Sequence, residues 1–254
     1  MKKALIGFTG FIGSNLLRQT EFGYLYNRNN VVDSQNEEFD LVVCTAPSAE
    51  KWRANKEPER DLEEVNNLIS SIKNIKTKHF VLVSTIDVYM NPYNVFEDTP
   101  MELNGLHPYG KNRYLIEKFV RRNFQNHLIV RLPALFGCGL KKNFLFDLIN
   151  SNCLDWTDRD SEFQFYGLAR LWADMNIAIH NSLKTINIVS EPVSAHEIAS
   201  CCFNLDFDNK TLKPPAKYNV KSRYDYLFGG EKGYMYGKDV IIREISEFIK
   251  SNCA

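Results

Sequence analysis

The chain has 254 residues, of which 44% are hydrophobic and 24% are charged, a composition typical of globular proteins. Its 31 basic and 31 acidic side chains cancel, so no overall charge favours nucleic acid or an anionic membrane as a partner. No apolar run approaches the roughly 18–20 residues that span a bilayer. These features predict a cytoplasmic protein.

The first half of the chain alternates short apolar runs, which predict strands, with longer amphipathic runs, which predict helices. The expected strands are Lys3–Gly7, Tyr24–Tyr26, Leu41–Thr45, Phe80–Val83 and His127–Leu132, with Asn30–Asp33 as a further candidate. The expected helices are Ser14–Thr20, Pro58–Ile75 and Tyr109–Phe124. Apolar strands separated by helices predict a parallel sheet covered on both faces. The segment between Tyr26 and Leu41 is too short for a helical crossover, so any helix there is expected to be missing or reduced to a turn.

Beyond about residue 140 the pattern becomes mixed. The expected helices are Lys141–Asn150, Leu171–Ser182, Ser194–Cys202 and Lys238–Lys250, and the expected strands are Glu162–Tyr166 and Thr185–Val189. Ser194 and Glu197 have the spacing of a capping box at a helix start.

Cysteine and histidine usage says little about chemistry. The six cysteines, which show no CxxC spacing and are expected to be reduced thiols, are Cys44, Cys138, Cys153, Cys201, Cys202 and Cys253. With 5 scattered histidines and no His/Cys cluster, no metal site is expected.

A glycine-rich segment follows the first strand directly. Its pattern is G-x-x-G-x-x-G, with Gly7, Gly10 and Gly13 as the glycines and Phe11 and Ile12 opening the next helix. The first glycine permits a tight turn, the second lets backbone approach a pyrophosphate, and the third lets helix and strand pack closely. The helix N-terminus offers unpaired N–H groups to phosphate. The position between strand and helix therefore favours a dinucleotide-binding loop over a turn without a ligand.

The second strand ends in Asn27 and Arg28, where an acidic residue would bind the ribose hydroxyls of NAD. No acid is present, and Arg28 could face a 2′-phosphate, which leans toward NADP. The alternative, a solvated turn arginine without a ligand, is about equally common.

Three further segments complete a pattern. A strand runs into Ser84 and Thr85, the next helix opens with Tyr109-Gly110-Lys111-Asn112-Arg113, and the following strand ends in Arg131-Leu132-Pro133-Ala134. With the glycine loop, this order and spacing over about residues 3–140 resembles the extended short-chain dehydrogenase/reductase family, the NAD-dependent epimerase/dehydratase group. The resemblance implies an α/β fold, a Rossmann-type doubly wound parallel sheet with a small mixed C-terminal lobe. It would comprise a dinucleotide-binding domain over residues 1–140, with 185–202 packed on it, and a substrate-binding lobe over 141–254.

The resemblance also implies roles for individual residues. Tyr109 matches the catalytic tyrosine that exchanges a proton with a substrate oxygen, and Thr85 matches its hydroxyl partner, for which Ser84 could substitute. The residues implied to line the cofactor are Gly7, Gly10, Phe11, Ile12, Gly13, Asn27, Arg28, Thr45, Ala46, Pro47, Ser84, Tyr109, Arg113, Pro133 and Ala134. The cofactor is implied to be NAD or NADP, and homodimerisation through the helix that includes Tyr109–Phe124 is implied as well.

One position departs from the family motif Tyr-x-x-x-Lys, because residue 113 is arginine. The family's lysine lowers the pKa of the tyrosine, which is near ~10 for a free phenol, and binds the nicotinamide ribose. A guanidinium supplies the same charge in a bulkier fork geometry. In isolation, Tyr109 could equally be a helix-start tyrosine, Arg113 a surface arginine and Thr85 a strand-end cap.

The second half contains aromatic residues that could stack on a base or sugar, and arginines that could bind a diphosphate. These are Phe163, Phe165, Tyr166, Trp172, Arg159 and Arg170. An aromatic core of a small lobe explains the same residues. The same choice between pocket edge and packing applies to residues 224–230 and 233–236.

The leading hypothesis is an NAD(P)-dependent oxidoreductase, epimerase or dehydratase acting on a carbinol carbon of a sugar, nucleotide-linked by resemblance to the family. Tyr109 would be the proton donor and acceptor, Thr85 the orienting group and Arg113 the electrostatic and ribose-binding partner. The first alternative is a catalytically silent NAD(P)-binding sensor or regulatory protein. A reductase of a small carbonyl compound is a third, weaker reading.

Overall fold

The computed structural model describes residues 1–252, and Cys253 therefore lies outside the described residues. The described chain divides into two compact units. The first comprises Met1–Met90, Thr99–Arg131 and Arg170–Ile186, and the second comprises Asn91–Asp98, Leu132–Ala169 and the chain from Asn187 onward. This division differs from a single boundary at residue 140, because the chain passes between the units several times.

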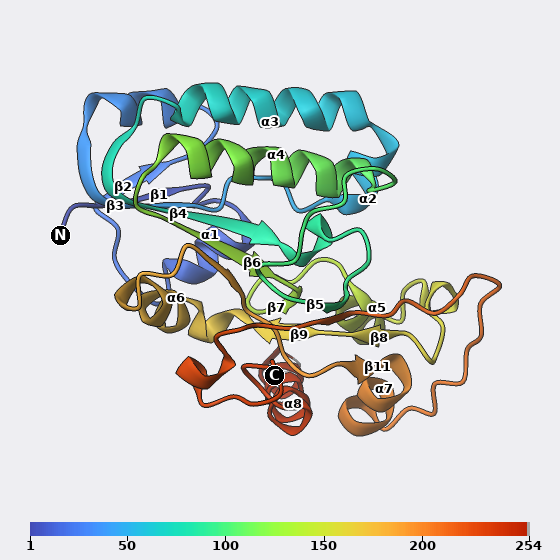
Figure 1. The fold of residues 1–254 in the computed structure, drawn as a ribbon. Helices are drawn as coiled ribbons and strands as arrows, with labels where there is room; N and C mark the ends of the chain where they lie inside the picture. The colour runs from blue at the N-terminus through green and yellow to red at the C-terminus, as the bar shows by residue number, and fades with distance from the viewer. Residues whose placement is uncertain (253–254) are drawn as a thin grey trace. The chain divides into compact units, whose positions relative to one another are not determined.

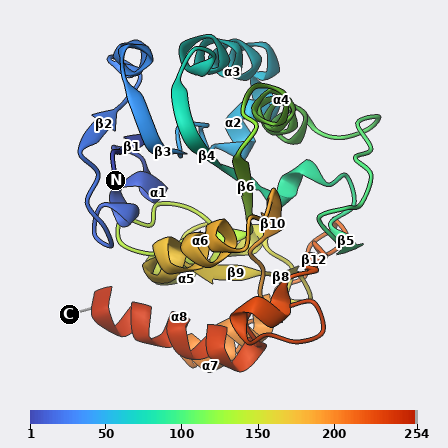
Figure 2. The same ribbon diagram turned by 60° about the vertical axis from the view of Figure 1, so that its left-hand side comes forward.

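The first unit is built on a six-stranded sheet with both faces covered by helices. In spatial order the strands are β10 (Thr185–Asn187), β6 (His127–Leu132), β4 (Lys76–Thr85), β3 (Glu38–Cys44), β1 (Lys3–Ile6) and β2 (Tyr24–Tyr26). The helices α3 (Pro58–Ile72) and α4 (Pro108–Asn123) cover one face, and α1 (Phe11–Leu16) and α6 (Leu171–His180) cover the other (Figures 1 and 2). This arrangement confirms the Rossmann-type parallel sheet predicted from the sequence.

The strands form because their residues are apolar and nearly continuous, as expected for strands buried on both faces. Each residue of β6 is buried, and the same is true of the four residues at the centre of β4 and the last four of β3. One core cluster of this unit joins the sheet to α3 and α4 through Val65, Ile72, Ile116 and Val120. Pro58 stands in the first turn of α3, where its missing N–H costs nothing.

Two local differences from the sequence predictions appear in this unit. Residues Val31–Asn36 form a 3-10 helix, not a strand, and this short crossover replaces the helix that the spacing could not hold. A short helix, α2 (Lys51–Lys56), precedes α3 and was not predicted, because Ala54 is its only buried residue and its sequence has no apolar stripe.

The second unit has its own core, formed by short strand pairs and three helices. The pairs are β11 (Val193–Ser194) with β8 (Glu162–Phe163), β12 (Asn219–Val220) with β5 (Tyr93–Val95), and β7 (Ala134–Phe136) with β9 (Phe165–Gly167). The helices are α5 (Phe144–Asn150), α7 (Ala195–Phe203) and α8 (Lys238–Asn252). The predicted capping box is confirmed at α7, where Ser194 and Glu197 exchange hydrogen bonds. Of the 185–202 segment, the strand joins the sheet while α7 lies in this unit.

Candidate active site

Strand register brings four predicted segments to one edge of the sheet. Ile6 of β1 pairs with Tyr26 of β2 and with Cys44 of β3, and Cys44 in turn pairs with Leu82 of β4. Because these strands run parallel, the residues that follow them leave the same edge. The edge therefore carries the glycine loop, the turn with Arg28, the segment from Thr45 and the hydroxyl pair at the end of β4. In open α/β sheets this is the edge at which ligands bind.

The glycine loop has the geometry that its spacing predicts. Gly7 has a φ of 90°, and a Cβ there would lie 2.7 Å from the backbone nitrogen of Ala46. At Gly13 a Cβ would lie 2.2 Å from the carbonyl oxygen of Gly7, so helix and strand approach as closely as glycine allows. Gly10 is less crowded, because a Cβ there would meet a single atom, the carbonyl oxygen of Gly7 at a tight 3.3 Å, and the residue is exposed. Gly7 and Gly13 therefore serve packing more strictly than Gly10 does.

Helix α1 begins beside that space without a capping side chain. Gly10 is its N-cap, in extended conformation, and makes no side-chain cap hydrogen bond. The N–H groups of Phe11, Ile12 and Gly13, in the first helical turn, have no partner within the helix. An unpaired helix start with a glycine before it is the arrangement that accepts a phosphate.

Thr45, Ala46 and Pro47 support the glycine loop from β3. The Thr45 hydroxyl donates to the carbonyls of Ile6 (3.1 Å) and Gly7 (3.2 Å), and the Thr45 amide donates to Ile6 as well. Ala46 is the residue that touches Gly7. Thr45 and Ala46 thus hold the glycine loop against the end of β3.

Asn27 and Arg28 form a turn after β2. The Asn27 amide donates to Oδ1 of Asn30 at 2.7 Å, which fixes the turn. The Arg28 side chain is 83% exposed and its nearest acidic group is Glu64 of α3, at 3.9 Å. The arginine is therefore at the predicted edge and able to reorient.

Tyr109 and Thr85 meet as the motifs predict. Tyr109 lies in the first turn of α4, where Asn55 Oδ1 of α2 accepts its backbone N–H at 3.0 Å. The Thr85 side chain acts on the Tyr109 phenol as a hydrogen-bonding group that lowers the pKa of the phenol. Thr85 Oγ1 also accepts the Asp87 N–H at 3.1 Å, which leaves the Thr85 hydroxyl proton to point elsewhere. His107 caps α4 by accepting the Gly110 N–H.

Arg113 packs beneath the Tyr109 ring, with its guanidinium carbon 4.5 Å from the ring centroid. Its terminal nitrogens bind both carboxylate oxygens of Asp61 from α3, at 3.0 and 2.9 Å. Its Nε donates to the Ser48 carbonyl at 3.1 Å. The Arg113 and Asp61 side chains are only 3% and 5% exposed. The guanidinium charge is therefore matched by a buried carboxylate that the sequence did not single out.

The electrostatics of Tyr109 reflect this arrangement. Burial raises the pKa of the phenol above its ordinary value, and the nearby Asp87 carboxylate raises it further. The charges of Arg113 and Lys51 and the hydrogen bond from Thr85 lower the pKa, but burial outweighs them. Arg113 thus acts in the expected direction without making the phenol more acidic than a free tyrosine.

Ser84 belongs to a different cluster. Its hydroxyl donates to Oε1 of Glu117 at 2.7 Å. Glu117 is fully buried on α4 and also receives Nε and Nη2 of Arg131, while Arg131 Nη1 donates to the Tyr89 hydroxyl at 2.7 Å. Ser84 and Thr85, adjacent at the end of β4, therefore have different partners.

Sequence reasoning missed Lys51, Asp87 and His107 beside Tyr109. Lys51 Nζ lies 2.7 Å from Oδ1 of Asp87. Burial and the Lys51 charge lower the pKa of the His107 imidazole, while Asp87 opposes them. Asp87 stands in the strand-end segment already quoted, but Lys51 carried no signal, because the helix that presents it was not predicted.

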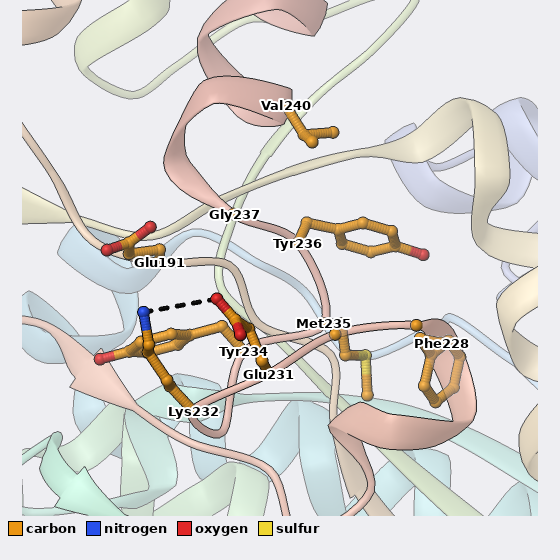
Figure 3. Close-up of a pocket in the computed structure, with 11 residues that line it drawn as sticks. Glu191, Phe228, Glu231, Lys232, Tyr234, Met235, Tyr236, Gly237 and Val240 are labelled. Carbon is orange, nitrogen blue, oxygen red and sulfur yellow. Dashed lines mark ion pairs between the residues drawn. The ribbon is translucent and has the colours of Figure 1, made fainter.

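Pro133 and Ala134 lie in the second unit, the latter at the start of β7. The same unit holds a cavity of about 420 Å³ lined by Tyr234, Tyr236, Phe228 and the neighbouring ion pair of Glu231 with Lys232 (Figure 3).

The predicted cluster of aromatic residues is divided between the two units. Phe163 and Phe165 pack in the core of the second unit, and Trp172 packs on Phe22 in the first.

Within the described residues, no group of three or more His, Cys, Asp or Glu side chains could hold a metal ion. No helix of the described chain is long and apolar enough to cross a membrane.

No protein-family model and no curated protein matches this sequence. Solved structures do match. A dTDP-4-dehydrorhamnose reductase from Clostridium acetobutylicum is 19% identical over the whole of both chains, with a TM-score of 0.74. The same enzyme from Bacillus anthracis, in complex with NADP, is 18% identical over 99% of each chain, with a TM-score of 0.75. A UDP-glucose 4-epimerase from Thermotoga maritima, with UDP-glucose, is 15% identical over 98% of each chain, with a TM-score of 0.69.

The fold of this chain is thus a Rossmann-type parallel sheet with helices on both faces. More particularly, the fold is the one shared by these reductases and epimerases. The resemblance read from the sequence motifs is confirmed at the level of the fold.

Proposed function

We propose that this chain binds NAD(P) at the carboxyl edge of its sheet and transfers a hydride between the cofactor and a carbinol or carbonyl carbon of a nucleotide-linked sugar. The observation that carries the proposal is that Thr85 acts on the Tyr109 phenol at the edge that also bears the glycine loop. The matched solved proteins support the proposal, because they are named as sugar-nucleotide reductases and epimerases and include complexes with NADP and with UDP-glucose.

The glycine loop fits the pyrophosphate of a dinucleotide. Gly10 adds no side chain at the place where α1 begins without a cap, so backbone N–H groups can approach a phosphate there. Arg28 is exposed next to this site, which favours NADP over NAD. The bound cofactor would supply the hydride.

Tyr109 would donate the proton. Because burial raises its pKa, the phenol stays protonated near neutral pH and can hydrogen-bond a carbonyl oxygen of the substrate. Thr85 would orient the phenol, since its own hydroxyl is aligned by the Asp87 N–H. The protonated phenol is the form that reduction of a carbonyl requires. Arg113 would hold the ring from below, and whether it also meets the ribose stays a prediction.

The cofactor site can be tested by binding. We expect the fluorescence of NADPH or NADH to report binding to the wild-type chain. Gly10→Ala should fold normally but weaken binding by about tenfold or more, because the added methyl group occupies the phosphate approach. Gly23→Ala is the matched control, because a Cβ there meets nothing within 4 Å. Wild-type protein that binds neither cofactor would refute the proposal.

The reaction can be tested with a panel of thymidine- and uridine-diphosphate sugars, by following oxidation of the reduced cofactor. Tyr109→Phe should lower turnover by about 10²–10⁴-fold, the usual contribution of a general acid, and leave cofactor affinity near that of wild type. Tyr114→Phe, on the same helix, is the control. Unchanged turnover in Tyr109→Phe would exclude Tyr109 as the acid.

A second candidate is a silent NAD(P)-binding sensor. It is favoured by the Asp61 carboxylate, which matches the charge of Arg113 and leaves the phenol less acidic than a free tyrosine. A sensor would bind reduced cofactor and oxidise it with none of the nucleotide-sugars.

A further inference from the structure

Two cations flank Tyr109, and they are held in different ways. Arg113 is buried and fully engaged by Asp61 and by the Ser48 carbonyl. Two hydrogen bonds join its fork to a single carboxylate, a geometry that resists rearrangement. Its charge is therefore committed within the protein and is a poor source of new stabilisation when Tyr109 loses its proton.

Lys51 is the other cation. It is the first residue of α2, and Asn55, one turn later, accepts the backbone N–H of Tyr109. Residues four apart share a helix face, so Lys51 lies on the face of α2 that meets the start of α4. Its partner Asp87 also adjoins this point, because a Cβ on Gly110 would lie 2.3 Å from the Asp87 carbonyl oxygen.

The Lys51–Asp87 contact differs from the Arg113–Asp61 pair in exposure. The Lys51 side chain is 38% exposed and that of Asp87 is 18% exposed. An ammonium on a flexible four-carbon stem can exchange one partner for another. Water partly screens this ion pair, so exchanging Asp87 for a new partner costs Lys51 less than breaking a fully buried pair would.

We propose that Lys51 is the mobile cation of this site, which moves from Asp87 toward the Tyr109 phenolate as the proton leaves, while Arg113 holds the ring and supplies a charge that stays fixed on Asp61. The inference rests on the proposed role of Tyr109 as acid. In the reaction the phenol proton passes to the substrate oxygen, and the phenolate that remains is what Lys51 stabilises. Lys51 acts through Tyr109 and is itself a positioning residue.

The charges around the phenol support this assignment. Lys51 faces it from α2, Asp87 from the turn after β4, Arg113 from within α4 with Asp61 of α3 behind it, and His107 from the start of α4. Of these, Arg113 lowers the pKa of Tyr109 most, Lys51 lowers it as well, and Asp87 raises it. Replacing the two residues one at a time should therefore move the titration of Tyr109 in opposite directions.

The experiment titrates Tyr109 by ultraviolet difference absorbance, taking the Tyr109→Phe protein as the blank. Lys51→Gln should shift the titration to higher pH, and Asp87→Asn should shift it to lower pH. Lys51→Arg keeps the charge and should stay near wild type. Lys56→Gln, an exposed lysine on the same helix, is the control.

Turnover gives the second readout. Lys51→Gln should move the pH profile of the reaction with the phenol and lower turnover at neutral pH by about tenfold, while Lys56→Gln leaves it unchanged. Titrations that do not move in Lys51→Gln and Asp87→Asn, or that move in the same direction, would overturn the inference.

The phenol titration requires no turnover and no cofactor, so the two proposals fail separately. Wild-type protein without activity, but with opposite shifts in the two variants, would refute the proposed function and show only that Lys51 stabilises the charged form of Tyr109. Active wild-type protein whose phenol and pH profile ignore both substitutions would do the reverse. Urea denaturation of each variant checks that substitutions at these partly exposed residues leave the fold intact.

Discussion

Ser84 and Thr85 follow one another at the end of β4, but they face two regions of opposite character. Successive side chains of a strand point to opposite faces, so the Ser84 side chain lies toward Glu117 and Arg131, and the Thr85 side chain lies toward Tyr109. Behind Ser84, Glu117 and Arg131 are almost wholly buried and bind each other through two hydrogen bonds. In front of Thr85, Tyr109 and the Lys51–Asp87 pair adjoin the carboxyl edge of the sheet.

The two regions therefore differ in how firmly their charged side chains are held. A buried pair satisfied on both sides holds elements in register and has no freedom to take a new partner. The pair beside Tyr109 is weaker and can respond when a proton leaves. Substitutions on the two sides should therefore separate stability from turnover.

The largest effect is expected behind Ser84. Glu117→Gln leaves the buried Arg131 guanidinium without a matching charge and should lower the free energy of unfolding by about 3–5 kcal/mol. Urea denaturation measures the change. Glu63→Gln, an exposed glutamate on α3, should leave the free energy of unfolding nearly unchanged. If both variants unfold at the same urea concentration, the Glu117 cluster does not stabilise the fold.

The next effect lies in front. Thr85→Val keeps the shape of the side chain but removes the hydroxyl that Tyr109 and the Asp87 N–H share. A hydrogen bond to a charged group contributes about 1.5–3 kcal/mol, so turnover should fall by about 10–100-fold. Steady-state kinetics with the reduced cofactor measures the loss. Turnover equal to wild type would mean that Thr85 does not orient the phenol.

Ser84→Ala is the matched variant on the other side. It removes one of several donors to Glu117, and the free energy of unfolding should fall by about 1 kcal/mol. Turnover of the folded protein should change little, because the Tyr109–Thr85 bond remains. A loss of turnover as large as that of Thr85→Val would show that the two regions are not separate.

Much of the fold followed from local pattern. Runs such as His127–Leu132 and the amphipathic stripe of α3 carry their structure in their own residues, so periodicity located them. The polar helix α2 and the 3-10 helix over Val31–Asn36 have no such stripe, and packing on neighbouring elements decides them. The glycine loop, Thr85 and Tyr109 were located because each belongs to a short motif that specifies both a local backbone conformation and a functional residue type.

The electrostatic partners could not be found in the same way. Asp61 lies more than fifty residues before Arg113, and only the packing of α3 on α4 brings the two together. The same holds for Lys51 and Asp87, which meet through the approach of α2 to the end of β4. The charge of Arg113, which was expected to lower the pKa of Tyr109, is therefore paired with Asp61, and no sequence spacing indicated this pair.

The smallest effect belongs to the opposite end of the same strands. His79 of β4 and His127 of β6 are both depressed in pKa, first of all by burial, and the positive charge of Lys184 acts in the same direction. His127 also bonds the Phe124 carbonyl, which opposes the depression, and Arg121 adds to it. Both imidazoles are therefore neutral in the folded protein at neutral pH.

A depressed histidine pKa has a definite sign for stability. The unfolded chain binds protons near its ordinary pKa of about 6.5, before the folded protein does, so stability is complete above that pH and declines as the pH falls below it. The decline ends once the pH is below the folded-state pKa values. Urea midpoints measured between neutral and mildly acidic pH should show this decline, and His79→Gln should flatten it. His180→Gln, at an exposed histidine, should follow wild type, and a His79→Gln curve as steep as wild type would place the proton uptake elsewhere.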